Sequence, residues 1–168
     1  MKKILLSVLS IIMVIVTLVP TALAANEQLS EWQDLILTEE EFNAILNNNT
    51  IHTIDEDTRA TGLISAYAMA ISKSGTNTLN IAGKTTGTAD VVKSGFKEVV
   101  IQRRANSSSS WTDYITYEDL YIEQIAYVLA KRITVPTGYQ YRVTCIHYAK
   151  KNFFSVQKID NVSNVIQF

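Results

Sequence analysis

The residue types that most often act as nucleophiles, general bases or metal ligands are scarce in this chain of 168 residues. It contains one cysteine, Cys145, and two histidines, His52 and His147. Cys145 and His147 share one face of a predicted strand, where they could act as nucleophile and base or as two metal ligands. Nucleophilic catalysis also needs a group that orients the base, and zinc usually needs three or four ligands. The surrounding sequence supplies neither, so the pair indicates a buried, inert thiol and a packed histidine.

Carboxylates are the other residues with catalytic potential. Glu118 and Asp119, with Asp113 and Glu123 nearby, suggest the pair of acids that glycoside hydrolysis uses. That reaction needs two carboxyl groups held roughly 5 to 10 Å apart across a cleft, whereas several acids in one polar stretch are typical of a solvated loop. His52 lies in an acidic stretch without the spacing of a ligand set. The sequence therefore predicts no enzyme, no cofactor and no metal site.

Four aromatic residues gather in sequence around one polar loop: Trp111, Tyr114, Tyr117 and Tyr121. Exposed aromatic rings on a rigid sheet can stack on sugar rings or anchor a protein partner. The competing interpretation places Trp111 and Tyr114 in the core, because tryptophan is highly buried on average. Of all the side chains in the sequence, these aromatic residues are the best candidates for a binding site.

Five basic residues fall on outward or edge positions of neighbouring predicted strands. They are Arg103, Arg104, Lys131, Arg132 and Arg142. Such residues can meet anionic wall polymers or lipid headgroups, and they also protect strand edges from pairing with other chains. We expect a cell-wall glycan or a surface protein as partner, and no nucleic acid. The candidate binding set is Trp111, Tyr114, Tyr117, Tyr121, Arg103 and Arg132.

Apolar and polar residues alternate from Thr61 onward with the period of two that is typical of β-strands. Strands are predicted over residues 63–72, 78–82, 96–104, 111–116, 124–135, 139–148, 153–158 and 162–168. Residues 83–94 are expected to form a loop with at most one short strand. A helix over 117–131 competes with the strand that begins at Gln124, but its β-forming residues and the turn that follows it favour the strand. Short strands at this spacing predict an antiparallel sandwich or small barrel.

Parts of this β region carry a resemblance to a known group of proteins. The run V-V-I-Q-R-R at 99–104 leads through a polar loop to Trp111-Thr112, and I-T-V-P-T-G-Y-Q-Y-R-V follows at 133–143. The pattern resembles small secreted Firmicutes (Clostridia-type) proteins that are grouped as a domain of unknown function. The resemblance covers residues 61–168 and implies an immunoglobulin-like β-sandwich of about seven strands, with no implied activity. Tyr141 lies four residues before Cys145 rather than two, so its spacing departs from the tyrosine corner of that fold.

An acidic arm over residues 25–60 precedes the β region, with nine acidic residues against one basic residue. The β region carries twelve basic and seven acidic residues, so the two parts differ in the sign of their charge. Capping-box spacing predicts one helical turn over 31–35 and a helix over 39–47. Three interpretations of the arm remain open: a pro-segment removed near Arg59, a helix that docks on the sandwich, or a disordered spacer.

Residues 1–24 have the features of a secretory signal peptide: a basic start, an apolar run at 4–19 and an A-x-A pattern at 22–24. An uncleaved membrane span is the alternative, although it would need about 20 apolar residues. A single cysteine excludes an intramolecular disulfide, so the exported domain must be held by core packing. We expect a secreted, extracellular protein of Gram-positive type that acts as a non-enzymatic binding module. The alternative is a secreted toxin or inhibitor whose acidic arm is a pro-segment.

Overall fold

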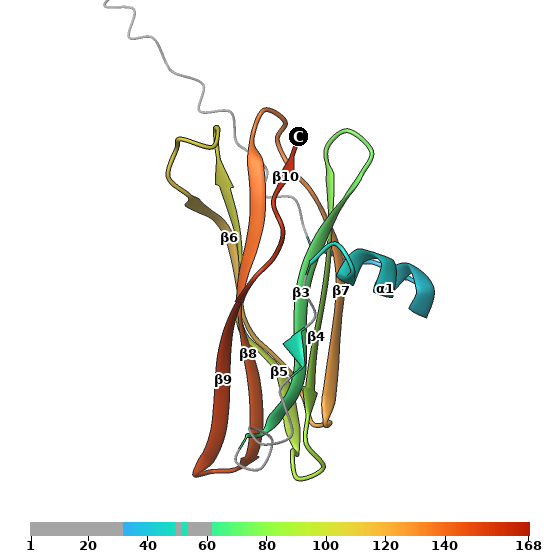
Figure 1. Cartoon of the computed structure of the whole chain (residues 1–168), viewed down its shortest axis with the longest axis vertical. Helices are drawn as coiled ribbons and strands as arrows, with labels where there is room; N and C mark the ends of the chain where they lie inside the picture. The colour runs from blue at the N-terminus through green and yellow to red at the C-terminus, as the bar shows by residue number, and fades with distance from the viewer. Residues whose placement is uncertain (1–31, 50–51, 54–61) are drawn as a thin grey trace, which may run out of the picture.

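The computed structural model describes residues 32–49, 52–53 and 62–168. Two antiparallel β-sheets face each other, and one short helix lies outside them (Figure 1). In chain order the elements are β1 (Gln33–Asp34), α1 (Glu39–Leu46), β2 (His52–Thr53), β3 (Ile64–Ser74), β4 (Thr78–Gly87), β5 (Lys93–Arg104), β6 (Thr112–Ile122), β7 (Ala126–Thr134), β8 (Gln140–Asn152), β9 (Ser155–Val162) and β10 (Ile166–Gln167). The predicted all-β antiparallel sandwich is confirmed, and seven of these strands, β3 to β9, form its body.

The strand order is that of an immunoglobulin-like sandwich. Sheet A has the order β1-β7-β4-β3-β2, and sheet B has the order β10-β8-β5-β6 with β9 also paired to β8. If β3 to β9 are lettered A, B, C, C′, E, F and G, the two sheets contain E-B-A and G-F-C-C′. The fourth strand, β6, therefore stays beside β5 in the sheet of the C, F and G strands, as in the variable-type arrangement.

The connection between β7 and β8 is held by Tyr141, which is fully buried near the start of β8. Its hydroxyl group donates a hydrogen bond of 2.7 Å to the carbonyl oxygen of Pro136, five residues upstream. Gly138 supplies the positive φ of 86° that the intervening turn requires. The contact is that of a tyrosine corner, although the spacing of Tyr141 from Cys145 departs from the usual one.

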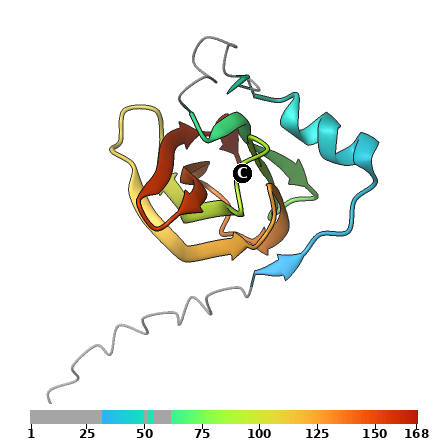
Figure 2. The ribbon, with the colours of Figure 1, turned by 90° about the horizontal axis from the view of Figure 1, so that it is seen from below.

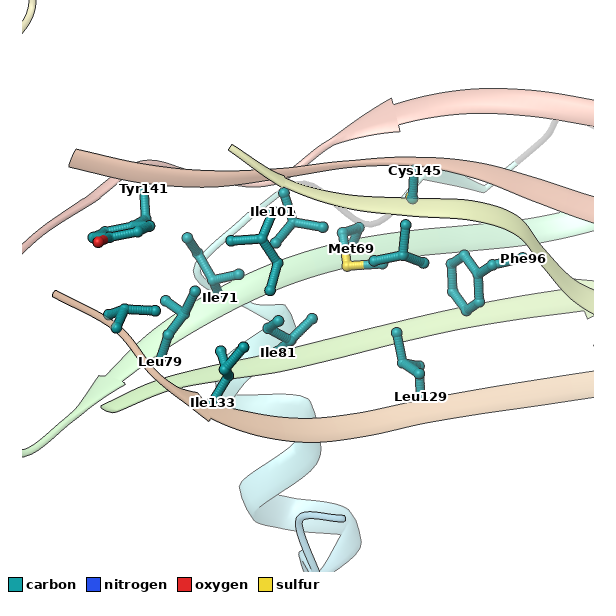
Figure 3. Packing of buried hydrophobic residues seen from close by; sticks show 13 residues of the cluster. Met69, Ile71, Leu79, Ile81, Phe96, Ile101, Leu129, Ile133, Tyr141 and Cys145 are labelled. Carbon is teal, nitrogen blue, oxygen red and sulfur yellow. The ribbon is translucent and has the colours of Figure 1, made fainter. Parts of the chain in front are cut away.

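The core lies between the two sheets and is built from alternate residues of facing strands (Figure 3). Val99 and Ile101 point inward from β5, and Cys145 points inward from β8 as a buried free thiol. The buried residues of this cluster are Met69, Ile71, Leu79, Ile81, Phe96, Val99, Ile101, Leu129, Ile133, Val135, Tyr141, Val143 and Cys145. The sandwich is thus held by apolar packing, which is the main driving force for folding.

The helix of the acidic arm forms where its capping box predicts. The Thr38 hydroxyl accepts a hydrogen bond from the Glu41 backbone, and the Glu41 carboxylate accepts one from the Thr38 backbone at 2.9 Å. The helix ends at Leu46, one residue before the predicted end. These hydrogen bonds from Thr38 lower the pKa of the Glu41 carboxyl group.

The arm helix docks on the outer face of sheet A (Figure 2). The contacting helix residues Phe42, Ile45 and Leu46 are buried, and the sheet presents three alanines to them. Those alanines are Ala68, Ala70 and Ala82. Alanine side chains allow a helix to approach a sheet closely, so this face of sheet A is covered by a segment of the same chain. Of the three interpretations of the arm, the docked helix is the one that the described residues display.

The segment before the helix differs from its prediction. The helical turn expected over 31–35 is wrong, because Gln33 and Asp34 form strand β1 and pair with Arg132 and Lys131 of β7. Pairing with the edge of sheet A satisfies backbone groups that an isolated turn would leave to solvent. Trp32, directly before β1, packs against the core cluster.

The strand predicted from Gln124 is confirmed by β7 (Ala126–Thr134), and its alternative, a helix over 117–131, is wrong. Two predictions in the β region are corrected. The strand expected over 111–116 continues to Ile122 as β6. The loop expected over 83–94 is also wrong, because β4 continues to Gly87 and β5 begins at Lys93. Gly83 is a strand position that the core crowds, because a Cβ there would lie 2.8 Å from side-chain atoms of both Met69 and Phe96.

The ends of the last strands also shift. The strand expected over 153–158 runs from Ser155 to Val162, and the one expected over 162–168 is reduced to Ile166–Gln167. The predicted signal peptide over 1–24 and most of the linker before Gly62 lie outside the described residues. Among the described helices, none is long and apolar enough to span a membrane.

Candidate binding surface

The carboxyl-terminal end of β5 divides its polar side chains between two faces. Gln102 and Arg104 lie on the outer face of sheet B, where they neighbour Arg142 and Gln140 of β8. Arg103, between them, lies on the opposite face, as the alternation of a strand requires. The outer group therefore draws on two adjacent strands whose positions are fixed by the sheet.

Trp111, just before β6, lies against two of these side chains. The guanidinium carbon of Arg104 is 4.3 Å from the centre of the indole ring, and that of Arg142 is 4.5 Å from it. Both distances are within the range of a cation–π interaction. We call the group of Gln102, Arg104, Trp111, Gln140 and Arg142 the Trp111 platform.

Hydrogen bonds between side chains fix the platform in place. Arg142 Nε donates to Gln102 Oε1 at 2.8 Å, and Arg104 Nε donates to Gln140 Oε1 at 2.7 Å. Gln102 in turn donates from Nε2 to Asp113 Oδ1 at 2.7 Å. Arg142 uses its Nε group for this bond, so the bond leaves both terminal nitrogens of its guanidinium group available as donors.

The platform holds two positive charges close together. Burial lowers the pKa of the Arg142 guanidinium group, and the neighbouring positive charge of Arg104 lowers it further. Neither arginine takes part in an ion pair with any carboxylate of the described residues. Asp113 reaches the network only through Gln102. An anion placed between the two arginines would relieve their repulsion and accept hydrogen bonds in the fork geometry that arginine provides.

Arg103 and Tyr114, two members of the candidate set, lie elsewhere. The Arg103 guanidinium group is 4.4 Å from the ring centre of Tyr114 and 4.9 Å from that of Tyr139, and Tyr114 meets Tyr141 edge to face. The register of β5 and β6 shifts between Ile101 and Gln102, and Tyr114 at this irregularity packs against the core. These residues close one end of the core instead of joining the platform.

Tyr117 also packs inward. Its ring meets Trp32 edge to face, and both residues pack against the core cluster. Burial, with a smaller contribution from Tyr114, raises the pKa of Tyr117 to about 12. Tyr117 is therefore a packing residue that joins the segment before β1 to β6.

Tyr121 and Arg132 are also separate from the Trp111 platform. Tyr121 is at the other end of β6, where its ring centre is 4.5 Å from that of Tyr148 and its hydroxyl group donates to Asp119 at 2.9 Å. Arg132 belongs to sheet A and lies opposite Gln33. Of the six candidate residues, only Trp111 belongs to the platform. The strand alternation signals Gln102 as an outward neighbour of Arg104, but Gln140 becomes visible only when β5 and β8 are known to be adjacent.

The Cys145–His147 pair is a buried polar network. The Thr85 hydroxyl donates to the Gly95 carbonyl oxygen at 2.9 Å, so it must accept from His147 Nδ1, which is 2.8 Å away. His147 Nε2 then remains as an acceptor for the Asn161 amide at 3.4 Å. Cys145 Sγ lies 3.5 Å from the same nitrogen.

Burial raises the pKa of the Cys145 thiol, which keeps it protonated and unreactive. Its side chain is only 3% exposed, and no cluster of three metal-ligating side chains occurs in the part of the chain that the structure describes. The predicted buried thiol is confirmed. The pair has neither the access nor the activated sulfur that nucleophilic catalysis requires.

The acidic residues of β6 and of the turn that follows it are dispersed along the chain. Asp119 pairs with Lys97 at 2.6 Å, and Glu123 pairs with Lys93 at 3.1 Å. Asp113 accepts a hydrogen bond from Gln102 near the opposite end. Asp113, Asp119 and Glu123 each have a different partner, and Glu118 lies opposite Glu98 of β5. Glu118 and Asp119 are therefore not arranged as the facing pair that glycoside hydrolysis uses.

Comparison of the chain with protein-family models, with curated proteins and with solved structures finds no match. The residues and distances of the Trp111 platform are therefore the basis for assigning it a ligand.

Proposed function

We propose that this protein is an exported, non-enzymatic binding module whose Trp111 platform binds an anionic glycan or another acidic wall polymer. The observation that carries the proposal is the pair of arginines held against one tryptophan without a carboxylate partner among the described residues. Two like charges held near one ring are unfavourable by themselves, so an arrangement that holds them there suits an anionic ligand.

The shape of the platform favours an extended ligand. It lies on the outer face of a sheet and combines two guanidinium groups, two amide side chains and an indole. Carboxylates or phosphates along a polymer can take bidentate hydrogen bonds from arginine, while sugar rings can pack on the edge of the indole. Export is supported by the signal-peptide pattern at 1–24, and membership of the small secreted Firmicutes proteins by the motifs at 99–104 and 133–143. We include both the export of the protein and this family membership in the proposal.

The direct test is a binding titration of the protein with a polyuronic acid and with poly(glycerol phosphate), using a neutral glucan as the reference. We expect binding to an acidic polymer that weakens as salt is raised, since exposed charges are screened. Arg142→Gln should reduce the affinity at least about ten-fold, because a charged hydrogen bond contributes about 1.5–3 kcal/mol. Arg132→Gln on sheet A is the matched control and should bind as the unmodified protein does. Equal binding by both variants, or no binding to either acidic polymer, would overturn the proposal.

A further inference from the structure

The turn between β8 and β9 presents two phenylalanines to solvent. Phe153 is 81% exposed and Phe154 is 92% exposed, and their rings meet edge to face with centres 5.1 Å apart. The Asn152 side chain accepts hydrogen bonds of 3.0 Å from the backbone of Phe154 and of Ser155. This turn holds the two phenylalanines at the tip of the hairpin. Their rings remain in solvent, although removing such apolar surface from water would be favourable.

Other exposed apolar residues lie at the same end of the sandwich. Val92 is the last residue of the β4–β5 connection, and its backbone N–H donates a hydrogen bond to the carbonyl oxygen of Lys150 in the hairpin. Val156 faces Lys150 across the hairpin, and Ile125 lies in the β6–β7 turn. All three are about half exposed. The β4–β5, β6–β7 and β8–β9 connections all lie toward the lower end of the view in Figure 1. We call this end, with Phe153 and Phe154 at its extreme, the Phe tip.

The β8–β9 hairpin of the Phe tip is positively charged. The hairpin from Lys150 to Lys158 contains three lysines and no acidic residue. Lys151 is paired with Asp90 at 2.7 Å. Lys150 and Lys158 have no carboxylate partner among the described residues, so the two apolar rings are flanked by uncompensated positive charge.

We propose that the Phe tip inserts into the surface of an anionic lipid bilayer, with Phe153 and Phe154 among the acyl chains and Lys150 and Lys158 at the headgroups. The rings project from the end of a hairpin, and a convex apolar tip fits a fluid layer that closes around it. Exposed apolar side chains beside lysines are the combination that binds anionic membrane surfaces. The charge of the hairpin selects lipid phosphates over a neutral surface.

This inference is independent of the Trp111 platform. The Phe tip and the platform lie at opposite ends of β5, which at the rise of a strand are roughly 35 Å apart. A molecule held by the Phe tip would direct the platform away from the lipid, where it could bind a polymer. Each activity can therefore be lost without the other.

The test is sedimentation of the protein with phosphatidylcholine vesicles that contain or lack phosphatidylglycerol. The chain from residue 25 onward is used, because it contains every residue of the described fold and lacks the apolar segment at 4–19, which would bind lipid itself. We expect binding to the phosphatidylglycerol vesicles only. Phe153→Ser with Phe154→Ser should lower the vesicle affinity at least about ten-fold.

Two matched controls separate the Phe tip from general properties of the surface. Ile36→Ser with Val165→Ser removes two exposed apolar side chains elsewhere and should leave vesicle binding unchanged. Lys150→Gln with Lys158→Gln should lower binding about five-fold per lysine, whereas Lys84→Gln with Arg132→Gln, on sheet A, should not.

Circular dichroism melting of each variant verifies folding, and the exposed positions should leave the melting temperature nearly unchanged. Absence of binding to phosphatidylglycerol vesicles would overturn the inference. So would a double-phenylalanine variant that binds as tightly as the unmodified chain, since the charge alone would then explain binding. Retained polymer binding by that variant would show that the platform acts separately.

Discussion

The outer faces of the two sheets differ in what covers them. Sheet A presents Ala68, Ala70 and Ala82, and α1 packs over them. Sheet B presents the Trp111 platform, and no described element of the chain covers it. Small apolar residues are needed where a helix must approach closely, while arginines and glutamines remain where the sheet meets solvent. The outer face of sheet A therefore stabilises the fold, whereas the outer face of sheet B is available to a ligand.

The largest expected effect is from removal of the arm. A chain that begins at Gly62 lacks Trp32, Phe42 and Leu46, all of which pack against the sheets. Loss of several large apolar contacts at about 2–5 kcal/mol each should reduce the free energy of unfolding by more than about 5 kcal/mol. Urea unfolding of the two chains measures the difference. An unchanged midpoint would instead favour a removable pro-segment, and with it the interpretation as a secreted toxin or inhibitor.

A paired substitution of one aromatic residue on each face sharpens the comparison. Phe42→Ala on the arm helix should reduce the free energy of unfolding by about 3 kcal/mol and leave polymer binding unchanged. Trp111→Ala should reduce polymer affinity about ten-fold while changing stability by less than about 1 kcal/mol. Urea unfolding gives the stability of each variant, and binding titration gives its polymer affinity. If Phe42→Ala impaired binding in the folded state, the two faces would not be separate.

The buried network between the sheets provides the reference for both faces. His147→Leu removes the hydrogen-bonding partner of Thr85 and Asn161 and leaves polar groups buried. The free energy of unfolding should fall by about 2–4 kcal/mol, because unsatisfied buried groups are costly. Polymer affinity of the folded variant should be unchanged. A loss of binding with unchanged stability would assign His147 to the ligand site and contradict its role as a packing residue.

The sandwich could be predicted from the alternation in the sequence, because strands such as β8 have one wholly buried face. The arm helix was equally visible, since a capping box is local. The continuation of β4 through Gly83 could not be predicted, because the reason for a glycine there is the approach of Met69 and Phe96 from other strands.

The site shows the same limit. Trp111 and Arg142 could each be selected by residue type, but the sequence places them 31 positions apart. Only the adjacency of β5, β6 and β8 brings them together. Tyr114 illustrates the reverse error, because an irregularity in the β5–β6 register directs it to the core. The assembly of the platform and the inward position of Tyr114 both depend on how strands distant in sequence pair. Composition and spacing contain little information about that pairing.

The smallest expected effect concerns the cap of the helix that covers sheet A. Thr38→Ala removes one half of the capping box and should reduce stability by about 1 kcal/mol. The pKa of Glu41 is lowered in the folded protein by its bonds to Thr38, so its stabilising contribution is present above the unfolded pKa of about 4.3 and is lost as the pH falls through the folded pKa. The difference in melting temperature between the unmodified chain and Thr38→Ala should therefore be constant near neutral pH and shrink below about pH 4. Trp111→Ala, on the uncovered face, should show no such dependence, because no carboxylate contacts the indole among the described residues. A difference that grew as the pH fell would contradict the assigned role of Glu41 and weaken the link between the cap and the covering of sheet A.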